Sequence, residues 1–157
     1  MSKQNAILTA AARLSSRNEF KGTQAYQKPS ISKKPNCDVP LKVLLVDDEI
    51  EFVQTLSERL QMRNIRSSVA YDGKSALELV RNDAPEVMIV DLKMPGIDGM
   101  EILKQVKQTR PEIKVIVLTG HGSEQDKKKC MDLGAFAYMQ KPVDINLLSE
   151  TLKKTDE

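Results

Sequence analysis

Three short apolar runs constrain the fold of this 157-residue chain more than any other feature. They cover residues 43–46, 87–90 and 115–118, and each is apolar at every position and rich in β-branched residues. Such runs are typical of strands that are buried on both faces of a sheet. Two weaker candidates, residues 67–70 and 136–139, are therefore expected at the edges of the same sheet.

Amphipathic stretches with helical spacing separate the predicted strands. Asp98 followed by Glu101 indicates a capping box at the start of the third helix, and Gly134 suits the end of a fourth, weakly apolar helix over about residues 124–133. The apolar faces of the other four helices are Val53, Leu56 and Leu60; Ala76, Leu77 and Val80; Ile102, Leu103 and Val106; and Ile145, Leu148 and Leu152.

Five strands that alternate with five helices imply an α/β fold with a parallel sheet covered on both faces, since a crossover helix separates neighbouring parallel strands. With the weak strands at the edges, the sheet takes the order 2-1-3-4-5. We therefore predict a doubly wound, five-stranded, flavodoxin-like domain over residues 41–155.

Residues 1–40 have a different composition, with seven basic residues against two acidic ones and no sustained apolar period. We expect a poorly ordered basic extension there, with a weak helix at residues 7–14. Its charges are dispersed and its aromatics are sparse, so nucleic-acid binding is not indicated. Few residues follow Leu152, so we expect a stand-alone domain or a fragment of a larger protein, without an output domain in this chain.

The two cysteines and the hydropathy bear on location. Cys37 and Cys130 match no metal-ligand spacing, which indicates free thiols in a reducing cytosol. No run approaches the ~20 apolar residues of a membrane span. We therefore expect a cytoplasmic protein without a membrane contact.

Polar residues follow four of the predicted strands, at the sheet edge where open α/β sheets bind ligands. Three carboxylates at one small site would repel one another unless a cation joined them, and oxygen ligands select a hard ion. Mg²⁺ fits best and Mn²⁺ could substitute. The three carboxylates are those of Asp47 and Asp48 after the first strand and Asp91 after the third. The other residues at this edge are Glu49 after Asp48, Thr119 and Gly120 at the fourth strand, and Lys141 and Pro142 after the fifth.

Each of these residues also has a simpler interpretation. Asp48 with Glu51 could be only a capping box for the first helix, Asp91 only a turn former, and Lys141 only a solvated lysine. Thr119 alone indicates nothing. The coincidence of four such signals at one end of one sheet favours a functional site.

With their order and spacing kept, these motifs resemble the receiver domain of two-component response regulators. The similarity covers about residues 41–155. It rests on Val43-Leu44-Leu45-Val46-Asp47-Asp48-Glu49, Asp91-Leu92-Lys93-Met94-Pro95-Gly96-Ile97-Asp98-Gly99, Leu118-Thr119-Gly120, and Gly134-Ala135-Phe136-Ala137-Tyr138 leading to Lys141-Pro142.

The resemblance implies a phosphoryl acceptor rather than an enzyme that turns over a separate substrate. Asp91 would attack the phosphorus of a phosphohistidine on a sensor histidine kinase or phosphotransfer protein. Mg²⁺ would be held by Asp47, Asp48, Asp91 and the backbone carbonyl of Lys93. The Lys141 ammonium and the Thr119 hydroxyl would stabilise the phosphoryl oxygens.

The resemblance also implies a switch, in which Thr119 moves to the phosphoryl group and Tyr138 turns inward. The simpler interpretation of Tyr138 is a half-buried aromatic on an edge strand. The readout surface would be the fourth helix, fifth strand and fifth helix. Lys93 and His121 would tune the lifetime of the acyl phosphate, and the Lys141-Pro142 bond is often cis in this family.

Three other classes were weighed. A haloacid-dehalogenase-like phosphatase needs an Asp-x-Asp spacing after the first strand, whereas this chain has adjacent acids. A flavodoxin-like binder would place a flavin phosphate among carboxylates that repel it. A degenerate receiver that acts only as a protein-binding module would not need all five key residues, which are Asp47, Asp48, Asp91, Thr119 and Lys141. We expect a downstream protein partner or phosphoryl relay, and a monomer or weak phosphorylation-dependent dimer.

Overall fold

The computed structural model describes residues 41–157, and they contain one five-stranded sheet. All neighbouring strands are parallel, and the order is β2-β1-β3-β4-β5, so the predicted topology is confirmed. The strands are β1 (Lys42–Val46), β2 (Arg66–Ala70), β3 (Val87–Val90), β4 (Lys114–Thr119) and β5 (Ala137–Gln140). The basic extension and the weak helix predicted within residues 1–40 lie outside the described residues.

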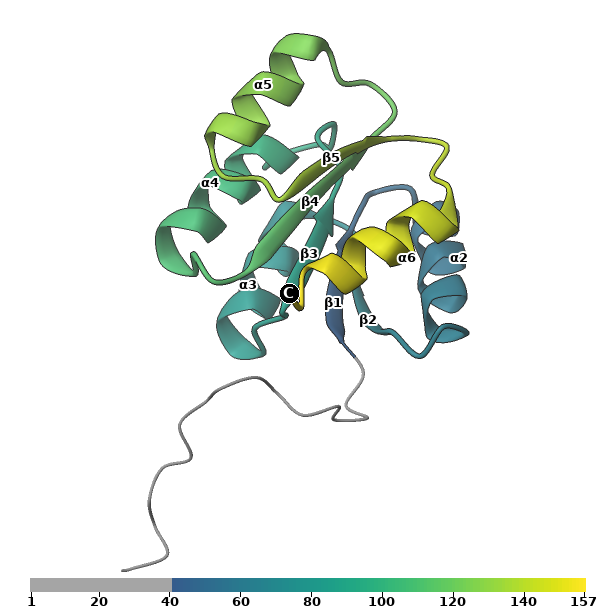
Figure 1. The fold of residues 1–157 in the computed structure, drawn as a ribbon. Helices are drawn as coiled ribbons and strands as arrows, with labels where there is room; N and C mark the ends of the chain where they lie inside the picture. The colour runs from purple at the N-terminus through teal and green to yellow at the C-terminus, as the bar shows by residue number, and fades with distance from the viewer. Residues whose placement is uncertain (1–40) are drawn as a thin grey trace, which may run out of the picture. The chain divides into compact units, whose positions relative to one another are not determined.

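Helices alternate with the strands and cover both faces of the sheet. Figure 1 shows α3, α4 and α5 on one side of the sheet and α2 and α6 on the other. This arrangement follows from crossovers that pass alternately in front of and behind the sheet. The helices are α2 (Ile50–Gln61), α3 (Gly73–Asn82), α4 (Gly99–Thr109), α5 (Glu124–Asp132) and α6 (Ile145–Lys154).

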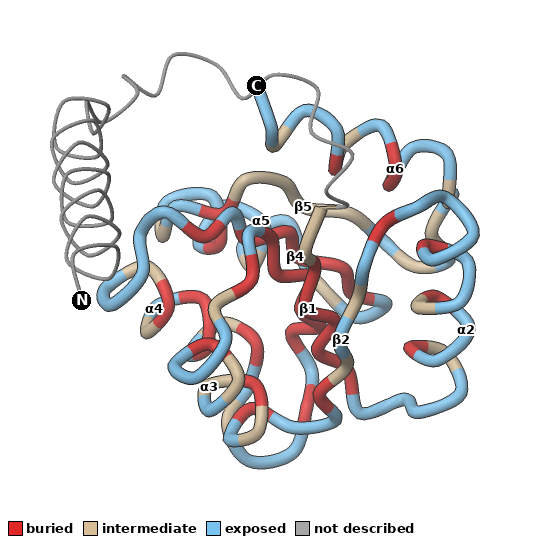
Figure 2. Tube along the Cα trace, turned by 90° about the horizontal axis from the view of Figure 1, so that it is seen from below, coloured by how far each residue is buried: buried red, intermediate tan, exposed pale blue. Residues whose placement is uncertain are grey.

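The continuous apolar runs divide between two cores, because successive strand residues point to opposite faces. Along β1, Val43 and Leu45 face the core beneath α2 and α6, whereas Leu44 and Val46 face the core beneath α3, α4 and α5. β3 and β4 alternate in the same way. Figure 2 shows the buried residues concentrated in these central strands. The edge strands β2 and β5 are only partly buried, as predicted.

Side chains define the starts of two helices at the functional edge of the sheet, and a glycine defines a helix end at the opposite edge. Asp98 accepts a hydrogen bond from the Glu101 amide at the start of α4. Ser123 and Asp126 form a reciprocal capping box at the start of α5, which we did not predict. Gly134 has a φ of 99° just after α5, in agreement with its predicted role.

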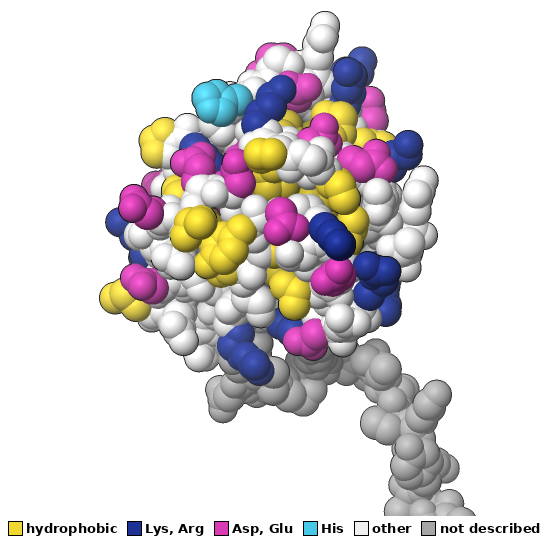
Figure 3. All heavy atoms as spheres, turned by 180° about the vertical axis from the view of Figure 1, so that it is seen from behind, with side chains coloured by type: hydrophobic (Ala, Val, Ile, Leu, Met, Phe, Trp, Pro, Cys, Tyr) yellow, Lys and Arg dark blue, Asp and Glu magenta, His cyan; other side chains and the backbone are white. Residues whose placement is uncertain are grey.

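The surface of the described residues carries charges of both signs. On the face shown in Figure 3, acidic and basic side chains are interspersed, and neither sign forms a continuous patch. Within residues 41–157, no helix has the length and apolar character needed to cross a bilayer.

Candidate functional site

Backbone hydrogen bonds that continue past the strand ends bring the polar residues together. The Asp91 amide donates to the Val46 carbonyl at 3.0 Å, which places the residue after β3 beside the residue after β1. The Lys141 amide donates to the Thr119 carbonyl at 3.0 Å in the same way. The convergence of these residues therefore follows from the parallel ladder itself.

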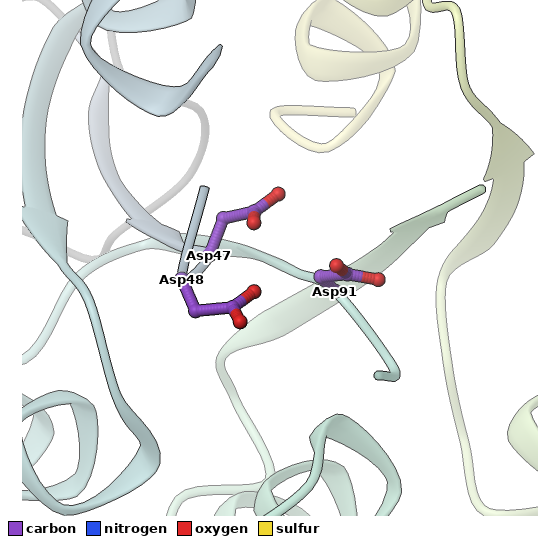
Figure 4. Close-up of side chains that lie close together, drawn as sticks. All are labelled: Asp47, Asp48 and Asp91. Atoms are coloured by element: carbon purple, nitrogen blue, oxygen red, sulfur yellow. The ribbon is translucent and has the colours of Figure 1, made fainter. Parts of the chain in front are cut away.

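Three carboxylates lie together at this edge. One oxygen from each of Asp47, Asp48 and Asp91 lies within 4.8 Å of the others, a span that a single cation could bridge. Figure 4 shows Asp47 and Asp48 projecting from the end of β1 and Asp91 from the end of β3. Asp47 and Asp91 are each only 4% exposed, whereas Asp48 is open to solvent. The site is therefore a buried acidic pair with one accessible acid.

The interpretation of Asp48 as a helix cap does not describe this structure. The N-cap of α2 is Glu49, and no side chain caps the helix there. The carboxylate of Asp48 instead points toward Asp91 (Figure 4). The capping box that the Asp48 and Glu51 spacing suggested is therefore not formed.

The electrostatics of the cluster oppose its full ionisation. Burial raises the pKa of Asp47, and the nearby charge of Asp91 raises it further, against the lowering by hydrogen bonds from Lys141 and the Glu49 amide. Carboxylates that are crowded and partly desolvated favour a cation as a neighbour. The donor set contains only oxygen atoms, which is what Mg²⁺ selects.

Lys141 contacts three carboxylates at this edge of the sheet. Its Nζ atom lies 2.6 Å from Asp47 Oδ2, 3.0 Å from Glu49 Oε1 and 3.4 Å from Asp91 Oδ2. Burial lowers the pKa of Lys141, but hydrogen bonds to Asp47 and Glu49 and the charges of Asp47 and Asp91 outweigh it, so that the net shift is upward. The ammonium therefore stays charged beside the Asp91 carboxylate. The Lys141-Pro142 peptide bond is cis.

Two contacts of Lys141 involve residues outside the predicted metal-binding and phosphoryl-stabilising set. Glu49 accepts one of its hydrogen bonds, and the ring of Phe52 lies 4.3 Å from Nζ. Glu49 is the N-cap of α2 and Phe52 is the third residue of that helix, so both lie at its start. Nothing in the sequence indicates which distant side chain the start of this helix meets.

Thr119 is the last residue of β4, and Gly120 follows it. Thr119 is fully buried, and its Oγ1 accepts a hydrogen bond from the His121 amide at 3.3 Å. A Cβ atom on Gly120 would have only Lys141 carbons nearby, at 3.9 Å, so the space above this position is open.

Tyr138 points inward from β5. Its ring packs against the core beneath α3, α4 and α5, and its hydroxyl lies where a Cβ atom on Gly122 would stand. A Cβ atom there would also lie 2.9 Å from Thr119 Cγ2, so Thr119, Gly122 and Tyr138 are close neighbours. Burial raises the pKa of Tyr138, as do nearby negative groups. Tyr138 is also half-buried on an edge strand, as the simpler interpretation has it, and the switch role stays a prediction.

Lys93 and His121 flank the cluster without joining it. The Lys93 amide donates to Asp91 Oδ1 at 3.4 Å, and its side chain is exposed. Hydrogen bonds from Ser123 lower the pKa of Asp126, and the charge of Lys93 adds a smaller lowering. His121 is also exposed, and the structure gives its imidazole no contact with the carboxylates. Of the predicted set, these two side chains are the ones that remain at the rim.

Comparison with known proteins identifies the family and the architecture. Residues 43–153 match the family described as the response regulator receiver domain. Sporulation initiation phosphotransferase F from Bacillus subtilis is 34% identical over 113 residues, which cover 72% of this chain and 91% of that protein. The transcriptional regulatory protein CpxR from Escherichia coli K12 is 41% identical over 101 residues, which cover 64% of this chain.

The chain spans only 43% of the length of CpxR. Among solved structures, a CheY-like receiver domain protein from Methanospirillum hungatei JF-1 aligns with a TM-score of 0.72 and 26% identity over 74% of this chain and 94% of that one. These matches decide against the phosphatase and flavodoxin-like alternatives. The chain belongs to the response regulator receiver family.

Proposed function

We propose that Asp91 is the phosphoryl acceptor of this receiver domain. Receiver domains act as phospho-acceptors in signalling, and the family match covers all of the sheet except Lys42. The observation that carries the proposal is the surroundings of the buried Asp91 carboxylate at the end of β3. The carboxylates of Asp47 and Asp48 lie beside it, and the Lys141 ammonium lies within hydrogen-bonding distance of it. An acid, a cation and a site for a metal ion are the parts that phosphoryl transfer needs.

In the proposed reaction, an Asp91 oxygen attacks the phosphorus of a phosphohistidine on a sensor histidine kinase or phosphotransfer protein. The P–O bond forms as the P–N bond breaks, the electron pair of that bond returns to the imidazole, and Asp91 becomes an acyl phosphate. Lys141 stabilises the charge on the phosphoryl oxygens from its position beside Asp91. This domain supplies the acceptor and its own catalysis of transfer and hydrolysis, without a separate substrate to turn over.

The chain's acids fit Mg²⁺, with Mn²⁺ as a substitute. Asp47, Asp48 and Asp91 would hold the ion, with the backbone carbonyl of Lys93 as a further ligand. When bound, such an ion neutralises negative charge on the acids and on the incoming phosphoryl group. The all-oxygen donor set and its span below 4.8 Å support this assignment.

Thr119 and Tyr138 form the proposed switch between the acceptor and a partner surface. Thr119 would donate its hydroxyl to the phosphoryl group, and Tyr138 would fill the space beside it. A groove between α5, β5 and the start of α6 is lined by Tyr138, Pro142 and Leu147 among others. Leu147 is 53% exposed, which suits an apolar anchor for a downstream protein.

Lys93 and His121 are proposed to tune the lifetime of the acyl phosphate. Both side chains are exposed, and each follows a residue of the cluster or the end of β4 by two positions. Replacement of each with Ala should change the rate of dephosphorylation, measured by the decay of the phosphoryl adduct. An unchanged rate in both variants would remove this role.

A second candidate output is phosphoryl relay rather than a protein contact. The Bacillus relative is called a phosphotransferase, and this chain covers 91% of its length. Relay requires that the phosphoryl group leave Asp91 for a histidine on another protein. It would be recognised by loss of the adduct on addition of a phosphotransfer protein, with gain of the same mass by that protein. In either case we place the reaction in the cytoplasm, with no direct nucleic-acid contact.

The proposal is tested by incubating the full chain with acetyl phosphate and Mg²⁺ and recording its intact mass. A single phosphoryl adduct on wild-type protein and on an Asp132→Asn control, but not on Asp91→Asn, is the expected result. Asp132 is a suitable control because it is an exposed aspartate at the end of α5. Absence of any adduct on wild-type protein would favour a degenerate receiver that acts only as a binding module.

A further inference from the structure

A phenylalanine ring lies against the ammonium group that the proposed phosphoryl chemistry uses. The centroid of the Phe52 ring is 4.3 Å from Lys141 Nζ, within the ~6 Å at which a ring face attracts a cation. The Lys141 side chain is only 12% exposed, so solvent screens this attraction weakly. We infer that Phe52 is a positioning residue that holds Lys141 beside the Asp91 acceptor.

The hydrogen bonds of Lys141 show why a ring is useful there. An ammonium group has three N–H donors, and three carboxylates, those of Asp47, Glu49 and Asp91, accept them. A ring face attracts the charge without using a donor. Phe52 therefore adds to the hold on Lys141 without competing with its hydrogen bonds.

The carboxylate contacts must change during the proposed reaction, and in this the inference rests on the proposed function. Asp47 and Asp91 are the acids expected to bind the cation, and Asp91 also receives the phosphoryl group. Lys141 must then exchange carboxylate oxygens for phosphoryl oxygens. The ring contact does not depend on any of those oxygens, so it can hold the ammonium in place while its other partners change.

The position of Phe52 in the fold restrains its ring. Phe52 is the third residue of α2 and packs against the core beneath α2 and α6. With Asp47 and Asp91, it also lines a small cavity between β1 and α2. Glu49, the N-cap residue of the same helix, accepts a hydrogen bond from the same ammonium. The start of α2 thus contacts Lys141 through Glu49 and Phe52, and the strand ends contact it through Asp47 and Asp91.

A simple packing role makes a different prediction from a cation–π role. If the ring only fills space, its electron density is irrelevant. If the ring binds the ammonium, withdrawal of electrons from its face must weaken the contact, since the attraction comes from the ring quadrupole. Fluorine substituents on the ring reduce that quadrupole while they change its size little.

The test therefore replaces Phe52 in the full chain with 4-fluoro-, 3,5-difluoro- and 3,4,5-trifluorophenylalanine. The rate of adduct formation from acetyl phosphate with Mg²⁺ should fall stepwise, by about two- to five-fold in total, which is the effect of an ordinary cation–π contact. The same substitutions at Phe136 are the control. That ring lies 5.9 Å from Lys114, away from the acidic cluster, and its fluorination should leave the rate unchanged.

A second measurement does not depend on phosphorylation. Urea unfolding with EDTA present compares Phe52→Leu, Lys141→Met and the double variant. Phe52→Leu should reduce the folding equilibrium constant about two- to five-fold more with Lys141 present than with Met at position 141.

A rate that is flat across the Phe52 series, or an equal fall in the Phe136 series, overturns the positioning role. Additive effects in the unfolding cycle overturn the ring–ammonium contact itself. Failure of wild-type protein to form an adduct would instead count against the proposed function, and the unfolding cycle would still decide whether the ring binds Lys141.

Discussion

The hydroxyl of Tyr138 occupies the space that a side chain on Gly122 would need, so the inward position of this tyrosine depends on a glycine in the loop after β4. The backbone of Gly122 is outside the positive-φ region, so an alanine could adopt it without strain. Steric exclusion is therefore the main effect that a Gly122→Ala substitution would have. This one substitution should therefore shift the Tyr138 side chain away from Thr119.

We expect Gly122→Ala to lower the free energy of unfolding by about 1–3 kcal/mol, as overpacking of a core usually does. Part of this cost should disappear in a Tyr138→Ala background, because the tyrosine atoms that clash are then absent and only the 2.9 Å approach to Thr119 Cγ2 remains. Urea unfolding of the four proteins measures the coupling. Equal costs of Gly122→Ala in both backgrounds would show that the tyrosine does not occupy this space.

The Tyr138 hydroxyl is buried and has no hydrogen-bond partner among residues 41–157. A buried polar group without a partner has lost its hydrogen bonds to water and gained none within the protein, which destabilises the folded state. We therefore expect Tyr138→Phe to raise the free energy of unfolding by roughly 1 kcal/mol. Tyr71→Phe is the matched control, since the Tyr71 hydroxyl accepts a bond from Gln54 at an exposed site and its loss should change little. A destabilised Tyr138→Phe variant would mean that the hydroxyl has a partner in solution.

Much of this fold could be predicted because strands that are buried on both faces have a distinctive composition. The runs in β1, β3 and β4 are continuous because each of the two sheet faces has its own core. The convergence of Asp91 and Lys141 on Asp47 and Asp48 could be predicted for a related reason. In a parallel sheet the carboxyl ends of all strands lie at one edge, so residues that follow different strands meet there.

The remaining features depend on side-chain packing that no local pattern records. The Asp48 and Glu51 spacing fits a capping box, and only the actual start of α2 at Ile50 shows that no box forms. The contact of Phe52 with Lys141 joins residues far apart in sequence and requires a particular orientation of both side chains. Gly122 received no prediction from sequence, because its role depends on the position of the Tyr138 ring.

Binding of Mg²⁺ at the acidic cluster should stabilise the fold by mass action. At a concentration one hundred times its dissociation constant, a ligand that binds only the folded state adds about 2.7 kcal/mol to the free energy of unfolding. Asp48→Asn should remove most of this gain, because it deletes the accessible carboxylate of the cluster. Thermal unfolding with Mg²⁺ and with EDTA measures the difference.

Glu51→Gln is the control for this experiment, because Glu51 is an exposed acid in the first turn of α2 and lies outside the cluster. It should keep the full response to Mg²⁺. If both variants lost the response equally, the effect would come from general surface charge rather than from a site.

Removal of the Lys141 ammonium should strengthen Mg²⁺ binding and slow phosphorylation. Nζ and a metal ion would compete for Asp47, whose Oδ2 lies 2.6 Å from Nζ. Lys141→Met should therefore bind Mg²⁺ more tightly, by roughly tenfold or ~1.4 kcal/mol, which is modest beside the ~4 kcal/mol for two unit charges 4 Å apart near a protein surface. Phosphorylation from acetyl phosphate should nevertheless become much slower, because the variant lacks the cation that stabilises the phosphoryl oxygens.

Isothermal titration with Mg²⁺ and the rate of adduct formation test the two halves of this prediction. Lys114→Met is the charge-matched control, since Lys114 begins β4 and takes no part in the acidic cluster. It should leave both quantities unchanged. Weaker Mg²⁺ binding by Lys141→Met would show that the ammonium organises the acids for the metal instead of competing with it. In that case the short Lys141 to Asp47 contact would have to be an aid to metal binding, and the two groups would act at the site together.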